Sequence, residues 1–344
     1  MNASPTLVPP AFDAAQARLP SLLSAAQQAC LAHVLQLATA SGYRFITPTP
    51  LTHQRVLNNA ARRPATSLRD IFGWNLPFAE DALSPNLFAS MVSTGIAQPC
   101  GPLWRSDVRV ASIDDALFLH SPFPTVQNEA VFFGPDTYRF VRFVRQSMHL
   151  APPLAKPGGL RLLDVGCGSG AGGIFAAGLL ARTASPVSLF CNDINPLALQ
   201  YVAINAAQAR RPVHLAPGDA LSAVSGEFDL IISNPPYLND PAQRAYRHGG
   251  GRLGSDLSLR IATQALGRLA PGGSLLLYTG VAMSGADDPF QAELLPVLAA
   301  SGCDWSYEEI DPDVFGEELE QPDYAGAERI AAIGLVATRR RHAD

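Results

Sequence analysis

The fold is decided by the stretch Leu230-Ile231-Ile232-Ser233-Asn234-Pro235-Pro236-Tyr237. Its apolar start predicts a buried β-strand, and the strand has to end abruptly because the two prolines have no backbone N–H and fix φ at about −65°. A residue before proline is itself held extended, so Asn234 is expected at the strand tip. Ligands of α/β sheets bind at the carboxyl ends of strands, and the stretch therefore predicts a binding site there.

Three groups at this tip suit one planar NH₂ group. The Asn234 side-chain oxygen and the Pro235 carbonyl oxygen accept its two hydrogens, while the Tyr237 ring packs on its π face. The nitrogen lone pair then points away from the protein toward an electrophile, which is the geometry of an N-methyl transfer. A buried strand followed by a Pro-Pro loop with a surface tyrosine accounts for the same residues equally well, so the rest of the chain has to decide.

Length and composition favour a globular protein of the cytoplasm. The 344 residues suffice for two domains, and the 47% hydrophobic content is ordinary. No uncharged run approaches the roughly 18 apolar residues that a membrane span needs, and residues 1–20 show no secretory signal. The five cysteines are scattered, odd in number and never spaced C-x-x-C, so we expect neither a disulfide framework nor a metal site.

The formal charge of −5 argues against an extensive nucleic-acid surface, because phosphate binding needs a basic face. It leaves room for a local patch.

Apolar periodicity divides the chain into three parts. Residues 1–130 are predicted to form a smaller, largely helical N-terminal substrate-recognition domain, with helices at 12–42 and 51–63, an irregular aromatic stretch at 67–85 and strands at 108–111 and 117–120. Residues 131–159 supply a connecting helix and a Pro/Gly linker. Residues 160–344 form the remaining domain.

After the linker, apolar strands alternate with helices. Seven strands are predicted at 160–165, 187–191, 213–216, 228–233, 274–279, 304–310 and 330–338, with helices at 171–182, 196–210, 256–269 and 290–300. This alternation indicates an α/β fold with a doubly wound, mostly parallel seven-stranded sheet. The last two strands are joined by a non-helical acidic loop at 311–323, so the last strand is a candidate to insert antiparallel.

A glycine-rich loop follows the first of these strands: Asp164-Val165-Gly166-Cys167-Gly168-Ser169-Gly170. Glycines at 166, 168 and 170 let the backbone turn sharply and approach a ligand where free helix N–H groups face outward. Residues 168–173 also satisfy G-x-G-x-x-G, so a nicotinamide enzyme is the rival interpretation.

Three aspartates favour S-adenosyl-L-methionine over a dinucleotide. Asp164 can meet the cationic methionine end, where a pyrophosphate would be repelled. Asp193, after the second strand, can take both ribose hydroxyls, and Asp219, after the third, can accept from the adenine amino group. Each is also explained as a helix N-cap, the commoner use of Asp at a strand-to-helix turn. Three aspartates at successive strand ends, in register with one glycine loop, favour S-adenosyl-L-methionine as the cofactor.

Together, the glycine loop, Asn192-Asp193-Ile194-Asn195, Gly218-Asp219 and Ser233-Asn234-Pro235-Pro236-Tyr237 resemble a class I S-adenosylmethionine-dependent methyltransferase of the N-P-P-Y branch. Within that branch the chain is similar to release-factor glutamine methyltransferases and adenine N-methyltransferases. Phe133-Gly134-Pro135-Asp136-Thr137 extends the likeness to about residues 130–338. The resemblance implies a Rossmann-like methyltransferase fold, a cofactor over the glycine loop, and Asn234 and Tyr237 holding the substrate nitrogen. Two features depart from the family: the first domain is longer and less regularly helical, and residues 246–252 lack its Glu-Pro element.

The sequence therefore predicts an S-adenosylmethionine-dependent N-methyltransferase acting on a protein glutamine side chain or an adenine exocyclic amine. The alternatives are a small-molecule N-methyltransferase, a non-catalytic binding module and a nicotinamide-dependent oxidoreductase, although the only lysine available for hydride chemistry, Lys156, lies in the linker. The predicted catalytic residues are Asn234, Pro235 and Tyr237. The predicted cofactor-binding residues are Asp164, Gly166, Gly168, Gly170, Asp193, Asp219 and Asn234. His248 is interpreted as a loop histidine beside Gly249–Gly251.

Overall fold

The structure is a computed structural model of the chain that describes residues 22–60, 64–151, 153, 156, 158–182, 185–251, 253–285 and 287–341. The expected start of the first helix near residue 12 lies outside the described residues, as do parts of the linker at 151–159. Residues 22–24 are described and are not helical, so the predicted helix at 12–42 was too long there: Ser24 is the N-cap. The first described helix is α1 (Ala25–Ala40), capped by Ser24, whose side chain accepts the N–H of Gln27.

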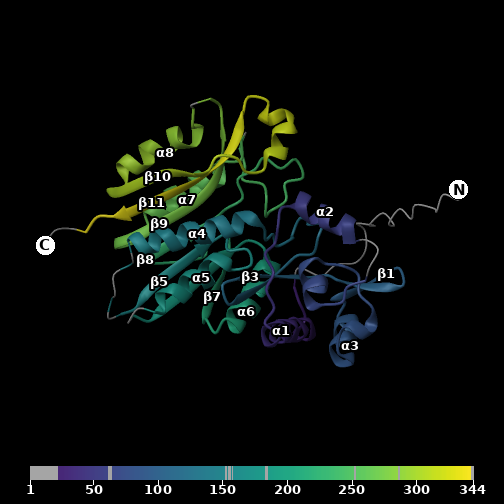
Figure 1. Ribbon diagram of the computed structural model, residues 1–344. Helices are drawn as coiled ribbons and strands as arrows, with labels where there is room; N and C mark the ends of the chain where they lie inside the picture. The colour runs from purple at the N-terminus through teal and green to yellow at the C-terminus, as the bar shows by residue number, and fades with distance from the viewer. Residues whose placement is uncertain are drawn as a thin grey trace.

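A seven-stranded sheet with the order β10-β11-β9-β8-β5-β6-β7 is the core of the part of the chain from residue 160 onward, which lies on the left in Figure 1. Its strands are β5 (Leu160–Val165), β6 (Val187–Asp193), β7 (Val213–Pro217), β8 (Phe228–Ser233), β9 (Leu269–Met283), β10 (Cys303–Asp311) and β11 (Arg329–Arg339). Strands β5 to β9 pair in parallel, and β11 lies antiparallel between β9 and β10. The mostly parallel sheet and the antiparallel last strand are both confirmed.

Helices cover both faces of the sheet, because the side chains of each buried strand alternate between them. Leu162 and Ile232 belong to one hydrophobic cluster with α4 (Pro135–Leu150), α5 (Ala171–Leu180) and α6 (Pro196–Gln208). Leu163 and Ile231 point the other way, into a cluster with α7 (Asp256–Leu266) and α8 (Pro289–Ala300). The acidic connection from β10 to β11, predicted as a non-helical loop at 311–323, contains two short 3₁₀ helices, Gly316–Glu320 and Pro322–Tyr324, so that prediction was wrong.

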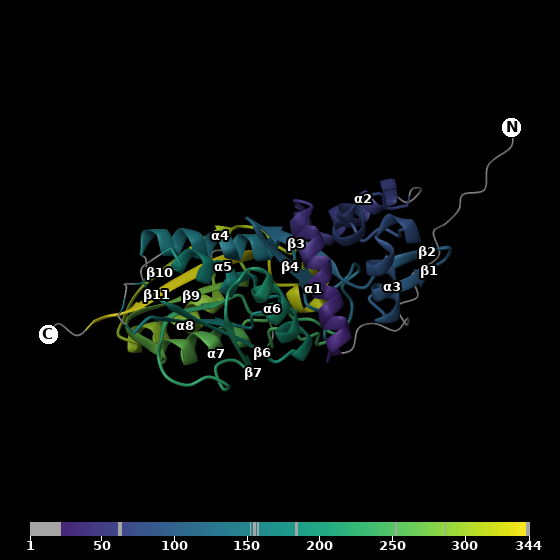
Figure 2. The ribbon, with the colours of Figure 1, turned by 90° about the horizontal axis from the view of Figure 1, so that it is seen from below.

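The first region contains helices and two hairpins. Beside α1 it holds α2 (Pro50–Ala60), a π-helical turn (Arg69–Gly73), a 3₁₀ turn (Glu80–Ala82), α3 (Pro85–Ser93), the hairpin β1 (Ala97–Cys100) and β2 (Leu103–Ser106), and the hairpin β3 (Arg109–Ile113) and β4 (Ala116–His120). The irregular stretch and the β3–β4 strands match the prediction, whereas α3 and the β1–β2 hairpin were not predicted. Leu31 and Leu35 of α1 share a hydrophobic cluster with Leu197 and Tyr201 of α6, so this region packs directly on the sheet's helices (Figure 2). The division near residue 130 stays a prediction.

The strand order places the site. From β5 the chain runs outward through β6 and β7 and then returns to β8 on the other side of β5. The tips of β5 and β8 are therefore neighbours at the point where the order reverses, with Val165 paired to Ser233. The Ser233 hydroxyl also donates to the Val165 carbonyl oxygen, 2.8 Å away. A crevice at such a reversal is where doubly wound sheets bind ligands.

Candidate active site

One cavity lies at the carboxyl ends of β5 to β8, and most of the predicted site residues line it. It is lined by Asp164, Gly166, Gly168, Asp193, Asp219, Asn234, Pro235 and Tyr237. Gly170 does not line it. A Cβ at Gly170 would lie 3.0 Å from Val202 Cγ2 of α6, and its φ of +77° places it in the left-handed region, so Gly170 serves the turn and the packing of α6.

Gly168 fits a close approach by a ligand. Its φ is +52°, which side chains rarely adopt, and a Cβ built there would meet no protein atom within 4 Å. Its N–H donates to Asp193 Oδ2 at 2.9 Å, so the loop is tied to the tip of β6. The loop therefore presents backbone rather than side chain to the cavity.

Asp193 is held from two sides. Oδ2 accepts the N–H of Gly168, and Oδ1 accepts the N–H of Asn195 at 2.9 Å. Burial raises the pKa of this carboxyl, although these backbone donors favour its ionised form. A carboxylate has about four lone-pair sites, and the backbone donors of Asn195, Gly168 and Ile194 do not use all of them, so Asp193 can still accept from a ligand.

We expect Asp193→Ala to weaken S-adenosylmethionine binding by about 1.5–3 kcal/mol for each charge-assisted hydrogen bond lost. Calorimetric titration with the cofactor measures this, and thermal unfolding shows whether the variant stays folded. Unchanged affinity in a folded variant removes Asp193 from the cofactor site.

Asp164 is almost fully buried, and its Oδ2 accepts the N–H of Gly173 in the first turn of α5 at 2.7 Å. Burial raises its pKa to about 7. It thus stabilises the start of α5 from the end of β5, but it is not the N-cap of that helix, which is Gly170. Asp164 also lines the cavity.

Asp219 is engaged by another side chain. It forms a two-pronged ion pair with Arg260 of α7, at 2.5 and 2.8 Å, and Arg260 lowers its pKa. Both side chains are about half exposed. An adenine amino group at Asp219 would therefore share the carboxylate with a guanidinium.

Asn234 is oriented by a residue that sequence reasoning missed, Asp136 of α4. Asn234 Nδ2 donates to Asp136 Oδ2 at 3.4 Å, and the Tyr278 hydroxyl donates to Asp136 Oδ1 at 2.5 Å. Asp136 is buried and lines the cavity, and burial raises its pKa. Since a carboxylate accepts and does not donate, this contact selects the amide nitrogen and leaves the Asn234 oxygen for another donor. The sequence marks Asp136 only as an acidic residue in the first turn of a helix, which is a common place for one, and gives no signal that it contacts Asn234.

Tyr237 is a buried cavity residue, 5% exposed, and not the surface tyrosine of the alternative interpretation. A Cβ at Gly280 of β9 would lie 2.2 Å from its ring, so that glycine makes room for it. The ring meets Phe315 edge to face, with centroids 5.9 Å apart. Burial raises the pKa of its hydroxyl well above the ordinary value, and the nearby Asp136 carboxylate raises this pKa further. The hydroxyl makes no hydrogen bond of ordinary geometry.

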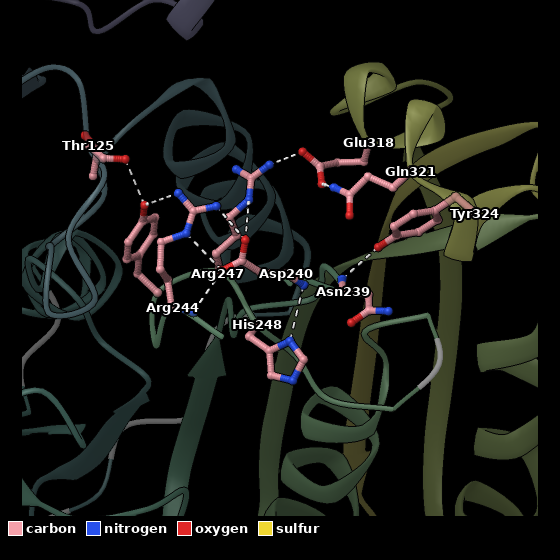
Figure 3. A network of polar contacts seen from close by, with 10 residues as sticks. Thr125, Asn239, Asp240, Arg244, Arg247, His248, Glu318, Gln321 and Tyr324 are labelled. Carbon is pink, nitrogen blue, oxygen red and sulfur yellow. Dashed lines mark hydrogen bonds and ion pairs between the residues drawn. The ribbon is translucent and has the colours of Figure 1, made fainter. Parts of the chain in front are cut away.

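The segment after the Pro-Pro turn is held in a polar network beside the cavity (Figure 3). Asp240, which is buried, accepts from both Arg244 Nε and Nη2, and Arg247 pairs with the buried Glu318. His248 Nδ1 accepts the N–H of Asp240 at 3.2 Å. His248 does not line the cavity, whereas Arg247 does.

The chain is similar in sequence to known methyltransferases. Residues 145–285 match the family model of the Methyltransferase small domain. A release factor glutamine methyltransferase of Koribacter versatilis is 32% identical over 195 residues, covering 53% of this chain and 62% of that protein. The enzyme of the same name from Deinococcus radiodurans is 35% identical over 173 residues, covering 46% and 55%. A ribosomal RNA small subunit methyltransferase C of Shewanella sp. (strain MR-4) is 43% identical over 77 residues, covering 22% and 21%.

The fold, the family model at residues 145–285 and the relatives indicate that this part of the chain is an S-adenosylmethionine-dependent methyltransferase domain. Within that class the chain resembles the release-factor glutamine methyltransferases, although it spans less than two thirds of the length of the two relatives of that name. The cofactor of the class is S-adenosyl-L-methionine, which sets the nicotinamide alternative aside. No helix in the described ranges is long and apolar enough to cross a membrane.

Proposed function

We propose that this chain transfers a methyl group from S-adenosylmethionine to a planar amide or amino nitrogen, such as a protein glutamine side chain or an adenine exocyclic amine. The contact between Asn234 and Asp136 carries the proposal, because it leaves an amide oxygen as a fixed acceptor beside Pro235. The glycine loop lies at the neighbouring strand tip. Donor and acceptor molecules would thus meet where the strand order reverses.

The cavity residues fit the cofactor. The open space above Gly168 would hold the methionine portion of the cofactor. Asp193 would accept from the ribose hydroxyls, and Asp164 would face the cationic methionine end. Asp219 would take the adenine amino group jointly with Arg260.

When bound, the cofactor supplies a sulfonium methyl group. The bonding pair of its carbon–sulfur bond would stay on sulfur as the acceptor nitrogen's lone pair forms the new carbon–nitrogen bond. The chain's residues hold both N–H groups, through Asn234 and the Pro235 carbonyl oxygen, and so disfavour delocalisation of the lone pair. The methylated nitrogen then loses a proton to water. Among the described residues that line the cavity there is no histidine, lysine or glutamate, in keeping with catalysis by positioning and fixed dipoles.

The test is a transfer assay. Purified protein and isotope-labelled S-adenosylmethionine are incubated with a glutamine-containing release-factor fragment, adenine-containing nucleic acid and small amines, and mass spectrometry locates the label. We expect one new N-methyl group on an amide or amino nitrogen. Label found only on oxygen, carbon or sulfur contradicts the proposal.

Cofactor affinity should depend on pH through Asp164. Its pKa is about 7 in the protein alone, and a bound cation would lower it. Below that pH, binding therefore releases a proton, so affinity should rise from about pH 5 to pH 7 and then level off. Calorimetry at pH 6 in two buffers of different ionisation enthalpy measures the release.

The matched control is Asp164→Asn, whose amide oxygen can still accept the Gly173 N–H. This variant should lose the proton release while keeping the fold. An affinity independent of pH in the unsubstituted protein would place the cation elsewhere.

A further inference from the structure

Two aromatic rings from distant segments face each other at this cavity. Phe132 precedes α4, and Tyr246 follows the Pro-Pro turn; their ring planes differ by only 10° and their centroids lie 6.2 Å apart. Both are half-buried, and both line the same cavity as Asn234 and Tyr237. We call them the ring pair.

The Phe132 ring has space reserved for it. Gly134 has an extended backbone with φ −159°, which any residue adopts, so its conformation does not require glycine. A Cβ at Gly134, however, would lie 2.6 Å from Phe132 Cζ. Glycine at this position therefore serves the placement of the ring.

The Tyr246 ring is fixed by its hydroxyl. That group donates to the Thr125 carbonyl oxygen at 2.9 Å and accepts from Arg244 Nη1 at 3.3 Å. Arg244 is itself locked to Asp240, and its guanidinium carbon lies 5.7 Å from the Tyr246 ring centroid (Figure 3). The polar network thus holds a flat apolar face beside the acceptor position.

We propose that the ring pair is the acceptor subsite and that the acceptor is a nucleobase carrying an exocyclic amino group. This inference rests on the proposed N-methyl transfer. Aromatic side chains recognise bases by stacking, which every base permits because each has a π face. A glutamine side chain has a much smaller flat surface, and a peptide needs partners for its backbone. The cavity instead adds further aromatic rings to the ring pair, those of Phe140, Tyr237 and Phe315.

The formal charge of −5 fits an acceptor held by its base and not along a phosphate backbone. A free nucleoside and a short single-stranded segment share this chemistry.

Binding can be tested without turnover. With S-adenosylhomocysteine filling the cofactor part, the full chain is titrated with adenosine, cytidine and guanosine, and with inosine and uridine as ligands lacking the amine. Phe132→Leu and Tyr246→Leu keep apolar volume but remove a flat face, and should weaken nucleoside binding about tenfold to a hundredfold. Tyr246→Phe, which keeps the ring, should lose less. Trp305→Leu replaces an aromatic residue on β10 that does not line the cavity and should change nothing.

Transfer assays show whether the base comes from a free nucleoside or from a nucleic acid. They also test the ring pair and the proposed N-methyl transfer separately. Label on nucleosides, or on a short RNA only, supports the ring pair and distinguishes the two sources. Label on a glutamine peptide and on no base overturns the ring pair while the N-methyl transfer stands. Label on no nitrogen at all overturns both. Nucleoside affinity unchanged in folded Leu variants that still bind S-adenosylhomocysteine also overturns the ring pair.

Discussion

Replacing Asn234 by alanine is expected to lower kcat by roughly 10²–10³, the range for losing one preorganised polar contact in a site that excludes water. The side-chain oxygen that Asp136 leaves free is the lost group, and the glycine loop is untouched, so cofactor affinity should barely move. Steady-state kinetics on the identified acceptor give kcat and KM, and calorimetry gives the cofactor affinity. A loss confined to kcat identifies an interaction made in the transition state.

Asp136→Asn provides the matched control, because it keeps the size of the side chain but offers an NH₂ group to Asn234. Either end of the Asn234 amide can then face the acceptor. If Asp136 acts through Asn234, the substitution lowers kcat alone and adds nothing in the Asn234→Ala background. Near-normal turnover of Asn234→Ala would show that the strand tip is structural and that the active site is elsewhere.

The sheet could be predicted because its signals are local. Each buried parallel strand is a short apolar run ended by a turn. The acidic connection before β11 holds two short 3₁₀ helices but no α-helix that could cross over the sheet, which favours an antiparallel insertion of β11. The strand ends could be predicted with it, since carboxyl ends of parallel strands meet at one edge. One cavity is therefore lined by Asp164, Asp193 and Asn234.

What the sequence could not show depends on contacts between distant segments. Strand β1 contains Pro99 and no apolar alternation, and it forms by pairing with β2, where Trp104 is also bridged to Phe78. Helix α3 is short, although Ser84 and Pro85 are typical start signals. Alternating glycines do not reveal which one faces a ligand, so Gly170 was placed in the cavity although it packs on α6.

The same limit applies to the site. Arg260 reaches Asp219 from α7, on the opposite face of the sheet from α6, and Asp136 reaches Asn234 from α4. Neither pairing has a sequence signal of its own, because each depends on how a helix packs on the sheet. Both pairings alter the expected chemistry. Arg260 occupies the carboxylate of Asp219, and Asp136 orients the side-chain amide of Asn234.

Gly168→Val is expected to abolish S-adenosylmethionine binding while leaving the sheet folded. Gly168 has φ +52°, and a Cβ there meets no protein atom within 4 Å, so the valine side chain would project into the space proposed for the methionine portion. Calorimetry measures the binding, and thermal unfolding measures the cost of the strained backbone, about 1–3 kcal/mol.

Gly101→Val separates the two effects of that substitution. Gly101, in the turn between β1 and β2, has φ +59° and likewise nothing within 4 Å of a Cβ, but it does not line the cavity. The two variants should therefore lose similar stability, because both force a β-branched residue into the left-handed region. Only the Gly168 variant should lose the cofactor, because only there does the side chain meet the ligand. Equal cofactor affinity in both would show that the loop at Gly168 is a tight turn and nothing more.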